Sequence, residues 1–136
     1  MTKPEVISAE PGIRVTAHAL NVGDRINTMG FEGEALSAVP LALRVGKTGV
    51  AVLFRYGVVV LIGVSPQDES GFLEKLTPRI GGRLKPFEEE IATVVVAGET
   101  EDQVQAGGPI QLRDMSSERL LVISDVLANL PMTNAK

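Results

Sequence analysis

The most regular apolar pattern in the chain lies near its middle, where two apolar runs flank a short gap. Residues 50–54 and 58–62 are apolar at every position, and Arg55, Tyr56 and Gly57 separate them. Three residues can close a β-hairpin when the last one is left-handed, a conformation that glycine reaches without a Cβ clash. Because both runs are apolar on both faces, we predict two central strands of a sheet that is covered on each side.

Shorter apolar runs predict the strands around this hairpin. Residues 14–20 alternate apolar and polar side chains, which predicts a half-buried strand with odd-numbered residues toward the core and His18 on the other face. The other predicted strands span residues 41–45, 91–97 and 110–112.

Three helices are predicted between these strands. Residues 32–39 are expected to form a short helix that Pro40 ends, since proline cannot continue the hydrogen-bond ladder. A second helix begins after Ser65, a good N-cap, with Pro66 at its first position. The third spans residues 117–130 and carries a wide apolar stripe. The pattern thus predicts an α+β fold, a mixed or antiparallel sheet with a central β-hairpin and two to three helices packed on it.

The length of 136 residues fits one domain. We predict a flexible lead-in at residues 1–13, a single globular α+β domain at residues 14–130 and a tail at residues 131–136.

Charge, cysteine content and the length of the apolar runs indicate which partners and which compartment to expect. Only 13 lysines and arginines are spread along a chain of net charge −4, so a nucleic-acid partner is not expected. The absence of cysteine fits a reducing compartment, and we expect a cytoplasmic protein. The most apolar stretch, residues 50–64, is interrupted by Arg55 and Gly57 and is shorter than the roughly 20 apolar residues of a spanning helix. We expect no membrane span.

Side chains that could carry chemistry are sparse. His18 is the single histidine, and without cysteine it cannot build a typical zinc site, so we expect it at the surface or at a sheet edge. The acidic runs at residues 88–90 and 99–102 lack the spacing of a calcium loop and are expected to be solvated. No metal site is predicted.

The glycine-containing motifs have structural explanations. Residues 81–85 lack the pattern of a phosphate-binding loop, and we interpret them as a helix exit with two basic side chains. Residues 46–49 have the spacing of a hairpin turn. No serine stands in a nucleophile elbow, so we predict no catalytic or cofactor-binding residues and no enzymatic activity.

The tip of the central hairpin is the candidate interaction site. Arg55 and Tyr56 are residue types favoured in interface hot spots, and Gly57 shapes the turn that presents them. The same side chains would equally fit a purely structural role, with Tyr56 packed over a sheet edge and Arg55 solvated.

One family shares these features. The segment Arg55-Tyr56-Gly57-Val58-Val59-Val60, followed by a helix start at Ser65-Pro66, resembles the signature of the "required for meiotic nuclear division" family. A second stretch, residues 110–112 followed by residues 118–128, is similar to the family's short strand leading into a helix. Members often carry large aromatics after the valine run, where this chain has Leu61 and Ile62.

The resemblance covers most of residues 14–128 and implies a domain of unknown function without established catalytic residues. Eukaryotic members are linked to support of mitochondrial translation at the inner membrane, so the resemblance implies a scaffold or tether rather than a catalyst. The long helical region and membrane segment that follow the last helix in the family are not recognisable in residues 130–136, so membrane anchoring is not expected from this sequence.

Two functional hypotheses remain. The first is a non-catalytic interaction or scaffold module that forms a homo-oligomer or binds a protein partner. The second is a small-molecule or anion-responsive regulatory domain, with or without enzymatic activity, whose anion ligands converge on one pocket. Its candidate ligands are Arg44, Arg55, Arg79 and Arg83.

Overall fold

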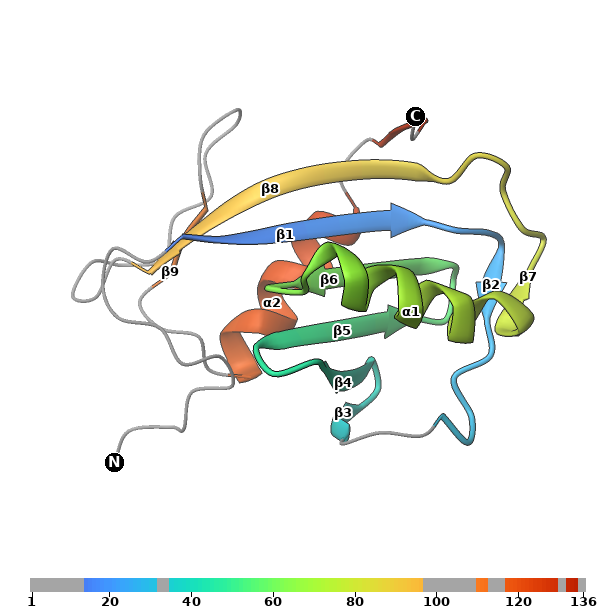
Figure 1. The fold of residues 1–136 in the computed structure, drawn as a ribbon, viewed down its shortest axis with the longest axis horizontal. Helices are drawn as coiled ribbons and strands as arrows, with labels where there is room; N and C mark the ends of the chain where they lie inside the picture. Colours follow the sequence, from blue (N-terminus) through green and yellow to red (C-terminus); the bar gives the residue numbers. More distant parts are fainter. Residues whose placement is uncertain (1–13, 32–34, 97–109, 113–116, 130–131, 135–136) are drawn as a thin grey trace.

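A long, curved sheet organises the chain (Figure 1). The computed structural model describes residues 14–31, 35–96, 110–112, 117–129 and 132–134. The strands of the eight-stranded sheet are β1 (Arg14–Asn21), β3 (Ala35–Ala38), β4 (Leu41–Val45), β5 (Gly49–Phe54), β6 (Val58–Ile62), β8 (Glu88–Val96), β9 (Ile110–Leu112) and β10 (Thr133–Asn134). They lie in the order β10-β8-β1-β6-β5-β4-β3; β9 pairs with β8 in parallel, and the other pairings are antiparallel.

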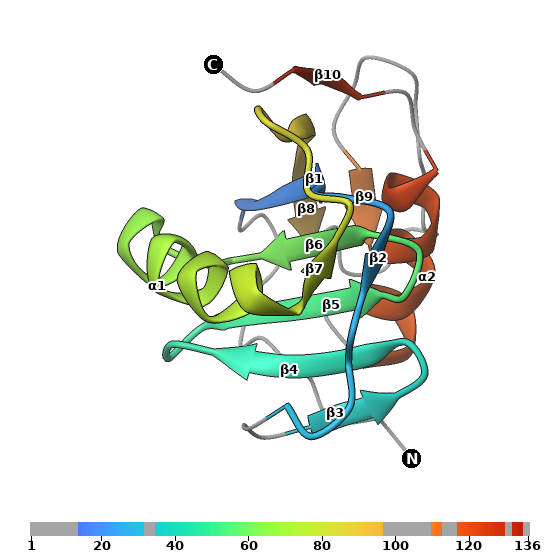
Figure 2. The same ribbon diagram turned by 90° about the vertical axis from the view of Figure 1, so that its right-hand side faces the viewer.

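The remaining elements lie on the two faces of this sheet. They are helix α1 (Pro66–Leu76), the 3₁₀ turn η1 (Thr77–Arg79), helix α2 (Ser117–Ala128) and a two-stranded sheet of β2 (Arg25–Ile26) and β7 (Ile80–Gly81). Seen along the sheet, α1 and α2 lie on opposite faces (Figure 2). The predicted α+β architecture with a central hairpin is confirmed.

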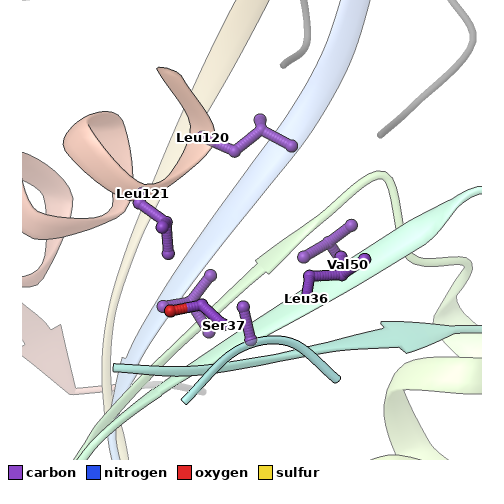
Figure 3. A pocket seen from close by; sticks show the side chains of 7 residues that line it. Leu36, Ser37, Val50, Leu120 and Leu121 are labelled. Carbon is purple, nitrogen blue, oxygen red and sulfur yellow. The ribbon is translucent and has the colours of Figure 1, made fainter. Parts of the chain in front are cut away.

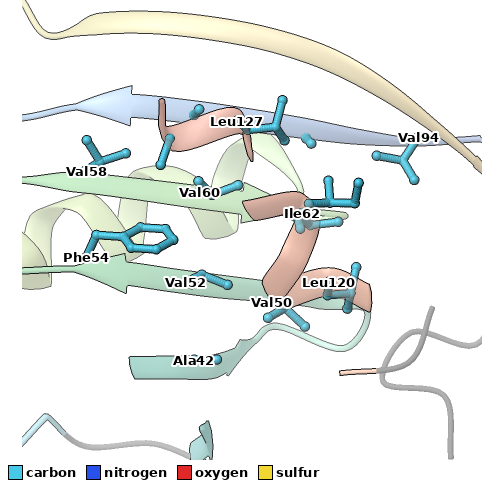
Figure 4. Close-up of a cluster of buried hydrophobic side chains, with 14 residues drawn as sticks. Ala42, Val50, Val52, Phe54, Val58, Val60, Ile62, Val94, Leu120 and Leu127 are labelled. Atoms are coloured by element: carbon cyan, nitrogen blue, oxygen red, sulfur yellow. The ribbon is translucent and has the colours of Figure 1, made fainter. Parts of the chain in front are cut away.

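The hairpin β5–β6 lies inside the sheet, as its composition predicts. Every residue of both strands is buried, and the register pairs Val50 with Ile62 and Phe54 with Val58. Alternate side chains therefore supply two separate cores. The α2 side includes Val50, Val52, Phe54, Val58, Val60, Ile62, Val94, Leu120, Ile123 and Leu127 (Figure 4). The α1 side includes Leu20, Val22, Leu43, Leu53, Val59, Leu61, Phe72 and Leu76.

Helix α1 begins as its sequence predicts. The Asp68 amide donates to the Ser65 hydroxyl at 3.2 Å, and Pro66 occupies the start of the helix, where its missing N–H costs nothing. Phe72 and Leu76 are buried against the sheet. Burying side chains of this size contributes about 1.5–3 kcal/mol each, so packing more than propensity holds the helix.

The helix predicted for residues 32–39 is wrong over its described part. Residues Ala35–Ala38 form strand β3, which pairs antiparallel with β4 from Ala38↔Leu41 to Ala35↔Leu43, with an irregularity between. Pairing with β4 satisfies the backbone hydrogen bonds of this short segment, and Leu36 packs against the core on the α2 side. Tertiary context here overrides the helical spacing of a few residues.

Two other boundaries also differ from the pattern. Strand β8 begins at Glu88 rather than at residue 91, so the first acidic run is part of the sheet. Residues Thr133–Asn134 of the predicted tail pair with β8 as β10. The second acidic run, residues 99–102, lies outside the described residues.

Candidate functional site

The tip of the β5–β6 hairpin is a turn fixed against the chain that follows β1. The Val22 amide donates to the Gly57 carbonyl and the Ile26 amide donates to the Arg55 carbonyl, each at 2.9 Å. The backbone on both sides of the tip is therefore held, whereas the side chains of Arg55 and Tyr56 are exposed.

Of the three candidate residues, Gly57 belongs to the interior of the turn. It is buried, has a φ of 102°, and a Cβ placed on it would collide with the Gly23 carbonyl group. Glycine is required here both by the backbone conformation and by the close approach of the two segments. Arg55 and Tyr56 are left as the residues that a partner can reach.

An open cleft of about 310 Å³ lies beside this tip, and we call it the tip cleft. It is lined by Thr28, Ala38, Val39, Pro40, Leu41, Leu53, Phe54, Arg55, Tyr56 and Asp125. Its walls thus come from the β3–β4 turn, the hairpin tip and α2, and they are mostly apolar. Val39 is 74% exposed and Tyr56 is 50% exposed, so two large side chains of the cleft contact water.

Tyr56 and Asp125 are two of the polar residues that line the tip cleft. The Tyr56 ring packs at a tilt against Phe54, with ring centroids 5.4 Å apart. Partial burial, and secondarily the Asp125 carboxylate, raise the pKa of the Tyr56 hydroxyl above its usual value. Asp125 of α2 is therefore close enough to Tyr56 of the hairpin tip to disfavour ionisation of its hydroxyl.

The sequence pattern identifies the tip but misses the other walls of the cleft. The pattern predicts a helix over residues 32–39, whereas the structure has the β3–β4 turn, which places Val39 beside the tip. Asp125 is one acid in an apolar-striped helix, and nothing in its spacing indicates that it faces Tyr56. Both depend on which strands are neighbours, which local periodicity does not encode.

Two other hollows differ in character. A cleft of about 290 Å³ between β4 and α1 has mixed polar and apolar walls, including Arg44, Asp68, Phe72 and Lys75. A pocket of about 10 Å³ lies between α2 and the β3–β5 region, where Leu120 and Leu121 face Leu36, Ser37 and Val50 (Figure 3). It has room for about one water molecule and is a packing defect rather than a ligand site.

The four arginines of the anion hypothesis have different surroundings. Arg44 lines the β4–α1 cleft, whereas Arg55 lines the tip cleft. Arg79 donates to three backbone carbonyls of the loop after β2 and stacks over a phenylalanine ring at 4.5 Å, and Arg83 lies 5.8 Å from another ring. Of the tip cleft, the β4–α1 cleft and the small pocket beside α2, all formed by the described residues, none is lined by more than one of these four arginines.

His18 is partly buried between two carboxylates rather than at the surface. Its Nδ1 lies 2.6 Å from Glu69 Oε1 of α1, and its Nε2 lies 2.9 Å from Glu89 Oε1 of β8. Both contacts are hydrogen bonds only when the ring carries two protons, because a neutral imidazole has a single N–H. His18 therefore connects α1 with two strands, an arrangement that the sequence pattern misses.

This cluster is not arranged as a metal site. The two carboxylates contact opposite nitrogens of the ring, so one ion cannot take all three donors. Within the part of the chain that the structure describes, no group of three or more His, Asp or Glu side chains is placed to hold a metal ion.

The motif at residues 81–85 also has a structural role. Gly81 belongs to β7, and its carbonyl accepts from the Asp24 amide at 2.8 Å, while Gly82 has a φ of 63°. The segment is thus a strand end and a turn packed against the β1–β2 connection. It follows η1, which is compatible with the helix exit that the sequence predicts.

None of the described helices is long and apolar enough to cross a membrane. Comparison with protein-family models, with curated proteins and with solved structures found no match. The resemblance to the "required for meiotic nuclear division" family therefore stays a prediction that depends on its sequence motifs. Within the described residues, the tip cleft is the candidate binding site.

Proposed function

We propose that this chain is a non-catalytic interaction module that binds a protein partner through the tip cleft. The observation that carries the proposal is an apolar cleft whose rim exposes two large side chains, Val39 and Tyr56. Apolar surface that stays in contact with water next to a concavity is typical of binding sites. Tyrosine is also among the residue types that dominate interface energetics.

The rigidity of the tip supports the same proposal. Arg55 and Gly57 accept backbone hydrogen bonds from the β1–β2 connection, so the turn is ordered before any partner arrives. Binding to such a surface loses little conformational entropy, and more of the contact energy appears as affinity.

A protein partner fits better than a second copy of the chain. The reason to expect self-association is surplus apolar surface on the last helix, but Leu120, Ile123 and Leu127 are at most 3% exposed in the chain's own core. Val122 is the large apolar residue of α2 that remains exposed, at 59%. The resemblance to a scaffold-type family is compatible with a partner of another kind.

The exposed valines provide a matched test. Peptides selected from a random display library on the purified chain would be measured against the wild type, Val39→Glu and Val122→Glu, with circular dichroism to show that each variant folds. We expect Val39→Glu to weaken binding by at least about tenfold, because it places a charge in the interface. Val122→Glu should bind as the wild type does. Equal binding by all three proteins, or loss only with Val122→Glu, would exclude the tip cleft.

A further inference from the structure

A carboxylate, that of Asp125, is part of the lining of the tip cleft. Asp125 is exposed on α2, and no Lys or Arg side chain of the described residues lies within ion-pair distance of its carboxylate. Beside it stands the Tyr56 ring, which packs against Phe54. An aromatic ring with a neighbouring carboxylate is an attractive environment for a cation, because the ring face and the anion both favour positive charge.

The rest of the cleft suits the stem of such a cation. Val39, Pro40 and Leu41 supply an apolar wall of the same cleft. Lysine and arginine side chains bury their methylene stems along apolar surface while their charged heads stay near water. A cleft of about 310 Å³ lies at the lower end of the range for binding pockets, so it suits one or two side chains rather than a large ligand.

We propose that the tip cleft receives a lysine or arginine side chain of the protein partner, with its stem on the Val39–Leu41 wall and its charge between the Tyr56 ring and Asp125. This inference rests on the proposed function and specifies the chemistry of the partner.

The charge distribution around Tyr56 agrees with this orientation. Arg55 also lines the cleft, and a guanidinium close to the Tyr56 hydroxyl would favour the ionised form. The pKa of Tyr56 is instead raised, first by burial and second by the Asp125 carboxylate. The same carboxylate attracts a basic head group toward α2.

The chain supplies its own probe for the test. Tyr56 is the single tyrosine and there is no tryptophan, so tyrosine fluorescence reports on this cleft alone. Short capped peptides that differ only in a central lysine, norleucine or glutamate would be titrated into the wild-type chain. The same titrations would be done with Asp125→Asn and with Glu74→Gln, which removes an exposed carboxylate of α1 on the opposite face of the sheet.

The lysine peptide is expected to bind about fivefold more tightly than the norleucine peptide, the size of an exposed cation–π contact with a nearby carboxylate. Asp125→Asn should reduce this preference, because only the cation–π contact with Tyr56 remains, and Glu74→Gln should keep it in full. Equal binding of lysine and norleucine peptides, tightest binding of the glutamate peptide, or no fluorescence response to any peptide would overturn the inference. Binding of norleucine that Val39→Glu removes would still support the interaction module, so the two proposals fail separately.

Discussion

Replacing Gly57 with alanine tests whether the hairpin tip is held by a close backbone approach. The added Cβ would collide with the Gly23 carbonyl group, and it would lie 3.2 Å from the Asp24 carbonyl carbon. Neither contact is with a flexible side chain, so the β1–β2 connection would have to move. The residue would also have to adopt a φ of 102°, which costs roughly 1–3 kcal/mol for a non-glycine residue.

The displacement adds to this conformational cost. Two backbone hydrogen bonds join the tip to the β1–β2 connection, and each contributes about 1 kcal/mol. The free energy of unfolding should therefore fall by about 3–5 kcal/mol for Gly57→Ala. This is a large part of the roughly 5–15 kcal/mol that stabilises a typical domain.

Gly30→Ala is the matched control. Gly30 also has a positive φ, of 66°, but a Cβ there would have nothing within 4 Å. Gly30→Ala therefore measures only the cost of a positive φ at a non-glycine residue, which is about 1–2 kcal/mol.

Urea denaturation followed by circular dichroism measures the difference. With a slope of about 2 kcal/mol per molar, the midpoint should fall by about 1.5–2.5 M for Gly57→Ala and by about 0.5–1 M for Gly30→Ala. Equal shifts for the two variants would refute the close approach and leave only the φ requirement. A larger shift for Gly30→Ala would contradict the whole argument.

Three further predictions concern other parts of the molecule. Ser124 is fully buried, and its Oγ has no hydrogen-bond partner among the described residues. Ser124→Ala should therefore leave the free energy of unfolding unchanged or raise it by up to about 1 kcal/mol in urea denaturation, and a clear loss would contradict the missing hydrogen bond. The raised pKa of Tyr56 means that its neutral form contributes stability below the usual value of 10.0, and that this contribution is lost as the pH rises through the raised pKa. Asp125→Asn should lower the pKa of Tyr56, measured by tyrosinate absorbance, and an unchanged titration would show that burial alone acts. A double-mutant cycle with His18→Gln and Glu69→Gln should give a coupling free energy of unfolding of about 0.5–1 kcal/mol, which decreases as salt is added. A coupling of zero would show that this contact between α1 and β1 does not stabilise the fold.

The sequence predicts the elements whose patterns are long or strongly marked. The double-sided apolar runs of β5 and β6 indicate interior strands because only burial on both faces can accommodate them. The start of α1 is marked by Ser65 and Pro66, which act through local hydrogen bonding and backbone geometry. These signals are contained within a few neighbouring residues, and the structure bears them out.

The features that the sequence does not predict depend on contacts between distant segments. Strand β3 is extended because β4 offers a partner, although its own residues show no alternation. His18 is on the non-core side of β1 by periodicity, yet α1 covers that side as well and brings Glu69 to the ring. The tip cleft likewise requires the β3–β4 turn and α2 to meet at the hairpin tip, and no local pattern contains this information.

The same two-sided burial explains why the candidate site lies at the end of the sheet. Helices occupy both faces of β5 and β6, so the central strands can present side chains to a partner only through their turns. At the tip, the buried Gly57 fixes the backbone while the adjacent Tyr56 remains half exposed. A partner that recognises this region must therefore use the rim residues of the tip cleft, and its affinity should respond to Val39, Tyr56 and Asp125 without any change in the core beneath them.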